Sequence, residues 1–380
     1  MNFANSTVSQ KQSNAERLMR CIIYSPHWLR TILLFVVKSA FYILTLAWGF
    51  RRCSFRLTGQ CESLRIVERV TEWLYAFFLC INNNNPNNPA GAYRFLFVLH
   101  MNNEMQWSSA TPGLLVILID QSGSMLLPME SPNEKETRTT FATKAVNRVI
   151  DTIIQKNFDG KAPKNRCFIS VIGYNHKVKN LIAGYLKDLD ENPIRVDKVK
   201  QKISDGAGGI LEIDKSMPIW VEPIKEDGAT NMKGAFEMAK EIIEKWISDK
   251  PSNPAPVIIN ISDGVPYFNR QGEEECKNQT IEVVNQIKAI DTADGKVQIF
   301  NAMIGNGTKA LFPASKEEIS TAEGKFLYDI STEIPDSYKG AAEKNGFSYK
   351  SGARGLICQC DGVELVGLID FGSSKGQGDR

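Results

Sequence analysis

From Gly113 onward, continuous apolar segments alternate with stretches whose apolar residues recur at helical spacing. Residues 114–119 (LLVILI) form an unbroken apolar run, which is typical of a strand buried on both faces. Further strands are predicted at 167–173, 178–183, 257–261, 297–304 and 326–330, and helices at 141–154, 232–246, 280–290 and 335–344. This alternation predicts an α/β fold with a doubly wound, mostly parallel central sheet and helices on both faces.

Two segments interrupt this alternation. Residues 205–227 form a long insertion, containing GGILEI and MPIWVEPI, that is predicted to be a hairpin or an irregular excursion near the strand ends. Residues 368–372 read LIDFG, which is similar to the magnesium-binding segment of protein kinases, and they overlap an apolar stripe at 365–371. The Gly-rich and H-R-D loops of kinases are missing, so this segment is interpreted as the apolar stripe of a closing helix.

Residues 1–100 differ in character from the rest. Residues 31–50 are apolar apart from Lys38 and are long enough to span a bilayer. Residues 82–89 (NNNNPNNP) are of low complexity and are interpreted as a linker. Two interpretations stay open: a membrane anchor at 31–50, or upstream sequence ahead of a protein that starts at Met101 or Met105.

Composition excludes some functions. Lys plus Arg number 45 against 43 Asp plus Glu, and no basic stripe stands out, so nothing indicates a nucleic-acid partner. The eight cysteines form no CxxC pair, so a zinc site is not indicated. A chain this long does not need disulfides for stability, and reduced cysteines in a cytoplasmic protein are expected. A membrane-anchored protein is the alternative if 31–50 is an anchor.

Candidate chemistry follows two predicted strands and precedes one predicted helix. Asp120, Ser122 and Ser124 come directly after the first strand, Thr230 precedes the helix at 232–246, and Asp263 follows the strand at 257–261. In doubly wound sheets, ligands bind where the carboxyl ends of the strands meet. Carboxylate and hydroxyl oxygens are ligands that suit Mg²⁺.

Each of these residues also has an ordinary structural interpretation. Ser122, Ser124 and Thr230 are residue types that often cap helices, and Asp263 precedes a glycine in a typical turn sequence. The combination of all of them, in order and at strand ends, favours a metal site.

The three segments DQSGSM, GATNM and ISDG together resemble the metal-ion-dependent adhesion site (MIDAS) of the von Willebrand factor type A (VWA) family. The resemblance implies a Rossmann-like VWA domain at residues 111–345, with 346–380 as a C-terminal extension packing on it. It also implies Mg²⁺, with Mn²⁺ or Ca²⁺ as alternatives, held by Asp120, Ser122, Ser124, Thr230 and Asp263. An acidic residue of a protein partner would complete the coordination. The chain is similar to stand-alone intracellular bacterial VWA proteins, some linked to tellurium resistance, which implies kinase or phosphatase partners.

A metal-dependent hydrolase or phosphatase using the same shell is the alternative function. Aspartyl-phosphate phosphatases need a second aspartate two residues after the first, where this chain has Ser122. His176 is the only histidine after Met101, which makes a His-based triad improbable, and no P-loop occurs. A non-enzymatic, metal-dependent binding module is therefore expected.

Overall fold

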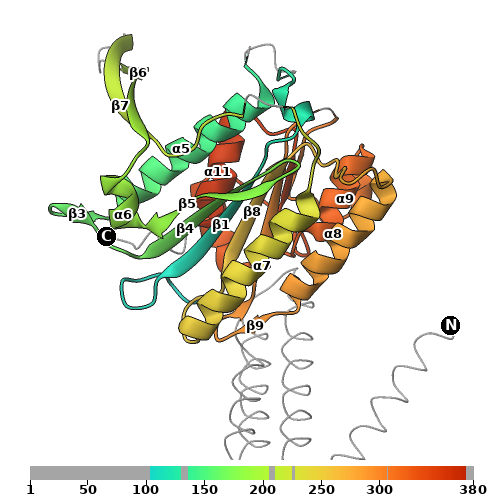
Figure 1. The fold of residues 1–380 in the computed structure, drawn as a ribbon. Coiled ribbons are helices and arrows are strands. Elements are labelled where there is room, and N and C mark those ends of the chain that lie inside the picture. The colour runs from blue at the N-terminus through green and yellow to red at the C-terminus, as the bar shows by residue number, and fades with distance from the viewer. Residues whose placement is uncertain (1–102, 130–135, 205–209, 225–226, 306, 374–380) are drawn as a thin grey trace, which may run out of the picture. The chain divides into compact units, whose positions relative to one another are not determined.

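The computed structural model describes residues 103–129, 136–204, 210–224, 227–305 and 307–373. A seven-stranded sheet runs through this part of the chain in the order β12-β13-β11-β8-β1-β4-β5 (Figure 1). Its parallel strands are β1 (Gly113–Asp120), β4 (Cys167–Tyr174), β8 (Val257–Ser262), β11 (Gln298–Met303) and β13 (Leu356–Cys358). The edge strands β5 (Val178–Tyr185) and β12 (Ala310–Leu311) run antiparallel to their neighbours.

Strand β1 is buried on both faces, as its apolar run predicts. Leu115, Ile117 and Ile119 share one core cluster with side chains from α5 (Arg138–Lys156) and α11 (Gly362–Gly372). The alternate residues Leu114, Val116 and Leu118 share a second cluster with α7 (Met232–Asp249), α8 (Glu273–Lys288) and α9 (Ala322–Ile330). Each such side chain contributes about 1.5–3 kcal/mol when fully buried. The predicted doubly wound α/β fold is therefore confirmed (Figure 1).

Short elements complete the described part of the chain. They are η1 (Gly123–Leu126), β2 (Phe158–Asp159), β3 (Ala162–Pro163), α6 (Leu186–Glu191), β9 (Asp291–Thr292), β10 (Gly295–Lys296), η2 (Lys316–Glu318), η3 (Asp336–Tyr338) and α10 (Lys339–Lys344). The helix predicted at 335–344 is thus divided into η3 and α10. The closing apolar stripe at 365–371 belongs to helix α11, whose first turn is capped by the Asp361 carboxylate.

The prediction of a strand at 326–330 is wrong, because these residues form the second half of helix α9. Their apolar side chains pack on one face of the sheet, and a buried helical turn and a buried strand look alike in so short a run. The helix begins at the Thr321 hydroxyl, which accepts a hydrogen bond from the Gly324 amide at 3.1 Å.

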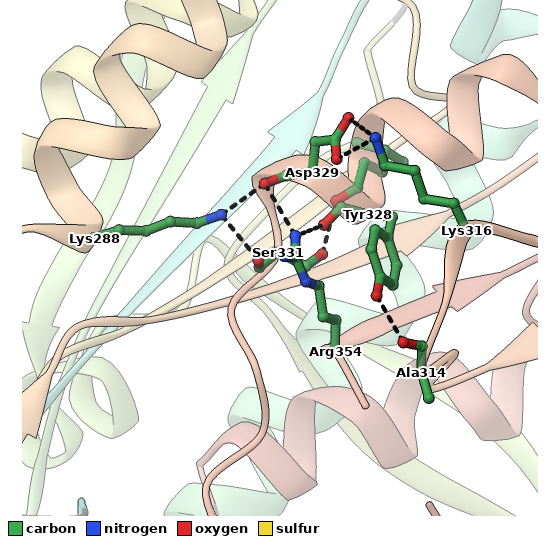
Figure 2. Close-up of polar contacts among 8 residues, drawn as sticks. Lys288, Ala314, Lys316, Tyr328, Asp329, Ser331 and Arg354 are labelled. Atoms are coloured by element: carbon green, nitrogen blue, oxygen red, sulfur yellow. Dashed lines mark hydrogen bonds and ion pairs between the residues drawn. The ribbon is translucent and has the colours of Figure 1, made fainter. Parts of the chain in front are cut away.

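Side chains from distant elements hold the carboxyl end of α9 (Figure 2). Lys288 Nζ donates to the carbonyl oxygens of Asp329 and Ser331 at 2.7 and 2.9 Å. Arg354 Nη1 donates to the Tyr328 carbonyl at 2.8 Å, and its guanidinium stacks on the Tyr328 ring. These cations satisfy carbonyls that a helix end leaves without intrahelical partners, so tertiary contacts favour a helix here.

The insertion predicted at 205–227 contains part of an antiparallel hairpin, but the hairpin begins earlier. Strands β6 (Arg195–Ser204) and β7 (Ile210–Ile219) form this ribbon, which stands off from the central sheet (Figure 1). After β7 the chain returns to α5, where the Asn147 side chain bonds the backbone of Trp220 and Val221. This anchor leads the chain back toward the carboxyl edge of the sheet.

The two features predicted at 31–50 and 82–89 lie outside the described residues. Within the part of the chain that the structure describes, no helix combines the length and apolarity needed to cross a membrane.

Candidate metal site

Asp120 ends the central strand β1 and is completely buried. Its two carboxylate oxygens have different partners. Oδ1 accepts from the Ser122 amide at 2.9 Å, and Oδ2 accepts from the Ser262 hydroxyl at 2.7 Å. The Ser262 hydroxyl in turn accepts from the Gly264 amide at 2.9 Å. The carboxylate is therefore fixed between the ends of β1 and β8.

The two serines of the first segment lie together on the loop after β1. Their hydroxyl oxygens are 3.1 Å apart, so one donates to the other. Ser122 occupies the N-cap position of η1, yet its side chain makes no capping hydrogen bond. The capping interpretation therefore fails for Ser122.

Another segment of the chain closely approaches Gly123, which lies between the two serines. The Gly123 amide donates to the Gly228 carbonyl at 2.9 Å, which joins the loop after β1 to the segment before α7. A Cβ on Gly123 would lie 1.7 Å from Asp227 Oδ1. The Asp227 carboxylate is thus brought to the first loop by the same contact.

Thr230 lies two residues after Gly228 and is buried. Its backbone forms a bridge with Tyr267, in which its amide donates to the Tyr267 carbonyl at 2.7 Å. The cap of α7 is the next residue, Asn231, whose side chain accepts from the Gly234 amide at 3.0 Å. The Thr230 hydroxyl is therefore not used to cap this helix.

Asp263 directly follows β8 and is nearly buried, with 8% of its surface exposed. Strands β1 and β8 are adjacent and parallel, with Ile119 opposite Ile261, so Asp263 and Asp120 lie at neighbouring strand ends. The turn interpretation is also satisfied, because Gly264 adopts a φ of 88° and the Val265 amide lies 3.4 Å from Asp263 Oδ1. A turn and a site contact can share one aspartate.

The electrostatics of this edge disfavour two bare carboxylates. Burial, and secondarily the charge of Asp263, raise the pKa of Asp120 from 3.8 to about 7. Burial and the Asp120 carboxylate likewise raise the pKa of the Tyr174 hydroxyl well above its usual range. A cation at this edge would relieve the cost that Asp120 bears when ionised.

A buried chain of polar side chains connects this edge with helix α9, and sequence reasoning missed it. Tyr174 Oη donates to Asn260 Oδ1 at 2.8 Å, and Asn260 Nδ2 donates to Asn301 Oδ1 at 2.9 Å. Asn301 Nδ2 then donates to Ser331 Oγ at 2.9 Å. A signal existed: Asn260 and Asn301 are single polar residues inside the apolar runs VIINIS and QIFNAM.

Arg138 was also missed, and its position in the polar sequence EKETRTT carries no signal. It is the first residue of α5, and its Nη1 lies 3.5 Å from Asp263 Oδ2. Ser262 was part of a recognised segment, but nothing in the sequence assigned it the hydrogen bond to Asp120.

The donor set fits a hard divalent cation. Two carboxylates and three hydroxyls supply oxygen only, which suits Mg²⁺ or Mn²⁺ and not a soft metal. Among the described residues, no three or more His, Cys, Asp or Glu side chains cluster in a way that could hold a metal. This site differs from such clusters because hydroxyls form most of it.

No protein-family model and no curated protein matches the sequence. Solved structures do match. The three N-terminal domains of the type V pili tip protein Mfa5 from Porphyromonas gingivalis are 20% identical over 41% of this chain and 20% of that chain, with a TM-score of 0.23. The manganese-loaded Plasmodium vivax TRAP protein is 16% identical over 66% and 70% of the two chains, with a TM-score of 0.30. The ArnB paralog VWA2 from Sulfolobus acidocaldarius is 18% identical over 63% and 46%, with a TM-score of 0.29.

This chain thus spans about a fifth of the Mfa5 structure and under half of the VWA2 structure. Identities and scores this low concern the fold alone. The likeness to these solved structures therefore concerns the α/β Rossmann-like arrangement described above. Any chemistry of this chain has to be argued from its own residues.

Proposed function

We propose that this domain is a VWA-type module that binds a divalent cation and, through it, an acidic side chain of a protein partner. The observation that carries the proposal is the convergence of Asp120, the Ser122–Ser124 pair and Asp263 at the carboxyl edge of the sheet. The contact between Gly123 and Gly228 supports including Thr230, which lies two residues after Gly228, in the same shell.

In this proposal Asp120, Ser122, Ser124 and Thr230 hold Mg²⁺ or Mn²⁺, and Asp263 accepts hydrogen bonds from its water ligands. The bound ion would supply an electrophilic position for an oxygen anion. The residues of the chain do the rest: Ser262 orients the Asp120 carboxylate, and the buried setting excludes competing water from it.

The proposal is of a binding module and not an enzyme. A cytoplasmic location is part of it, and the four described cysteines, which are free and buried, suit a reducing compartment. Phosphatase assays on the wild type and Asp120→Asn should show no turnover in either protein.

Isothermal titration of the full chain with Mg²⁺ and Mn²⁺ tests the metal site directly. Wild type should bind one ion, and Asp120→Asn should lose binding because it removes the buried charged ligand. Asp151→Asn is the matched control, since Asp151 is a buried carboxylate on α5 paired with Lys215, away from the site. A pull-down in Mg²⁺ and in EDTA then tests the partner. Metal binding that is equal in all three proteins, or partner binding that survives chelation, would place the function elsewhere.

A further inference from the structure

One cation of the chain itself lies at the proposed site. Arg138 Nη1 is 3.5 Å from Asp263 Oδ2, and the two side chains are only 9% and 7% exposed. The Arg138 amide donates to the Leu127 carbonyl at 3.0 Å, so the start of α5 is tied to the loop that carries Ser122 and Ser124. Arg138 therefore belongs to the site and not to the solvent-exposed surface.

The loop after β11 forms the other wall around Arg138. A Cβ added to Gly305 would lie 3.5 Å from the guanidinium carbon, and Gly305 has a φ of 138°. Charged side chains that the structure places near this edge include Arg138, Asp120 and Asp263, together with Asp227 against Gly123 and Glu323 against Gly264. Arg138 is the positive member of that group.

The charge balance depends on this arginine. Without a metal, Asp120 and Asp263 are offset in part by one guanidinium. With a divalent cation added, the ion and the guanidinium together exceed the two buried carboxylates by one positive charge. Asp227 is left out of this balance because it is exposed, and water screens its charge. If residue 138 were neutral, the same two carboxylates and one ion would balance, and an anionic ligand would meet no net attraction.

We infer that Arg138 sets the charge of this site: it compensates Asp263 in the metal-free protein, weakens metal binding, and makes the metal-loaded site attract an anion. This inference rests on the proposed metal-dependent function. Charges this close and this buried interact strongly, because water screens them little. The same guanidinium therefore opposes the cation and favours the carboxylate of a partner.

The test uses full-length wild type, Arg138→Met, Arg138→Gln and Arg138→Lys. Mn²⁺ affinity is measured by titration calorimetry, and acetate, as a minimal carboxylate probe, is titrated into the Mn²⁺-loaded proteins by water-proton relaxation. Thermal melts in EDTA are recorded in parallel. Arg138→Gln is a second neutral variant, which keeps a hydrogen-bond donor for Asp263 if the methionine variant folds poorly.

The neutral variants should bind Mn²⁺ at least about tenfold more tightly than wild type, because a like charge beside the ion is gone. Once loaded, they should bind acetate more weakly, and in EDTA they should melt at a lower temperature. Arg138→Lys keeps the charge and should resemble wild type in all three measurements.

These directions separate the inference from a purely structural role. If Arg138 only helped α5 to pack, its replacement would lower the melting temperature and weaken Mn²⁺ binding together. Neutral variants that bind Mn²⁺ as wild type does, or more weakly, would overturn the inference. Wild type that binds no Mn²⁺ would instead overturn the proposed function itself, so the two failures are distinguishable.

Discussion

Replacing Asp120 with asparagine should stabilise the metal-free protein at neutral pH and abolish its stabilisation by metal. The asparagine oxygen can still accept from the Ser122 amide, and its amide can donate to the Ser262 hydroxyl, which reverses the second hydrogen bond and turns the Ser262 proton toward another acceptor. The substitution therefore removes a buried charge without removing its local contacts. Only the electrostatic cost of ionising Asp120 should change.

The size of the effect follows from the pKa of Asp120, which burial and the neighbouring Asp263 raise from 3.8 to about 7. A displacement of that size is worth roughly 4 kcal/mol, at about 1.4 kcal/mol per pKa unit. Because the folded protein holds this proton more tightly than the unfolded chain, the free energy of unfolding falls as pH rises from about 4 to about 7. Asparagine does not titrate, so the variant should escape this loss.

The assay is urea unfolding in EDTA at about pH 5 and about pH 8, repeated at about pH 8 in excess Mg²⁺. In EDTA the advantage of Asp120→Asn over wild type should be larger at the higher pH, by about 2 to 3 kcal/mol over this interval. Excess Mg²⁺ should stabilise wild type by about 2.7 kcal/mol at a hundredfold excess over Kd, and the variant not at all.

Two outcomes would refute this reasoning. A variant less stable than wild type in EDTA at both pH values would mean that the Asp120 charge is used for folding. An equal magnesium shift in both proteins would mean that the ion binds at another place. Asp151→Asn, measured in parallel, should keep the magnesium shift of wild type.

Three further substitutions probe the surroundings of the site. Thr230→Ala should lose only part of the magnesium-induced rise in melting temperature, because water can replace a neutral ligand. If the variant kept the full rise, Thr230 would not be a ligand of the ion. Tyr174→Phe deletes a buried hydrogen bond to Asn260 and should cost about 1 kcal/mol or more in urea unfolding, since Asn260 loses its donor. Lys288→Met removes the charged donor of the Ser331 carbonyl and leaves the Asp329 carbonyl only the longer bond from Arg354 (Figure 2), so it should cost about 1–3 kcal/mol, measured in the same way. An unchanged free energy of unfolding in either variant would contradict these assignments.

The fold class could be predicted from sequence because burial on both faces leaves a plain pattern. Strand β1 is apolar at every position from Leu114 to Ile119, and the helices α5, α8 and α11 follow the inner strands β1, β8 and β13. Where the pattern is short it fails: residues 326–330 look like a strand but form α9, because Lys288 and Arg354 from distant elements hold its end.

The candidate site could be predicted only to the extent that its residues follow predicted strands or precede a predicted helix along the sequence. Asp120, Ser122 and Ser124 follow one strand, and Asp263 follows another, so their proximity is a consequence of parallel neighbouring strands. The close approach of the Asp227 carboxylate to Gly123 is a tertiary feature that the spacing of these residues does not reveal.

What only the tertiary structure decided is the environment of those carboxylates. Arg138 lies in an ordinary polar sequence at the start of α5, and no periodicity or spacing relates it to Asp263, which is 125 residues away. The Tyr174–Asn260–Asn301 chain likewise joins strands β4, β8 and β11, and in the sheet β1 lies between β4 and β8 although it precedes both in the sequence. Local sequence determines which residues end a strand, but burial and charge at that end depend on which distant segments pack against it.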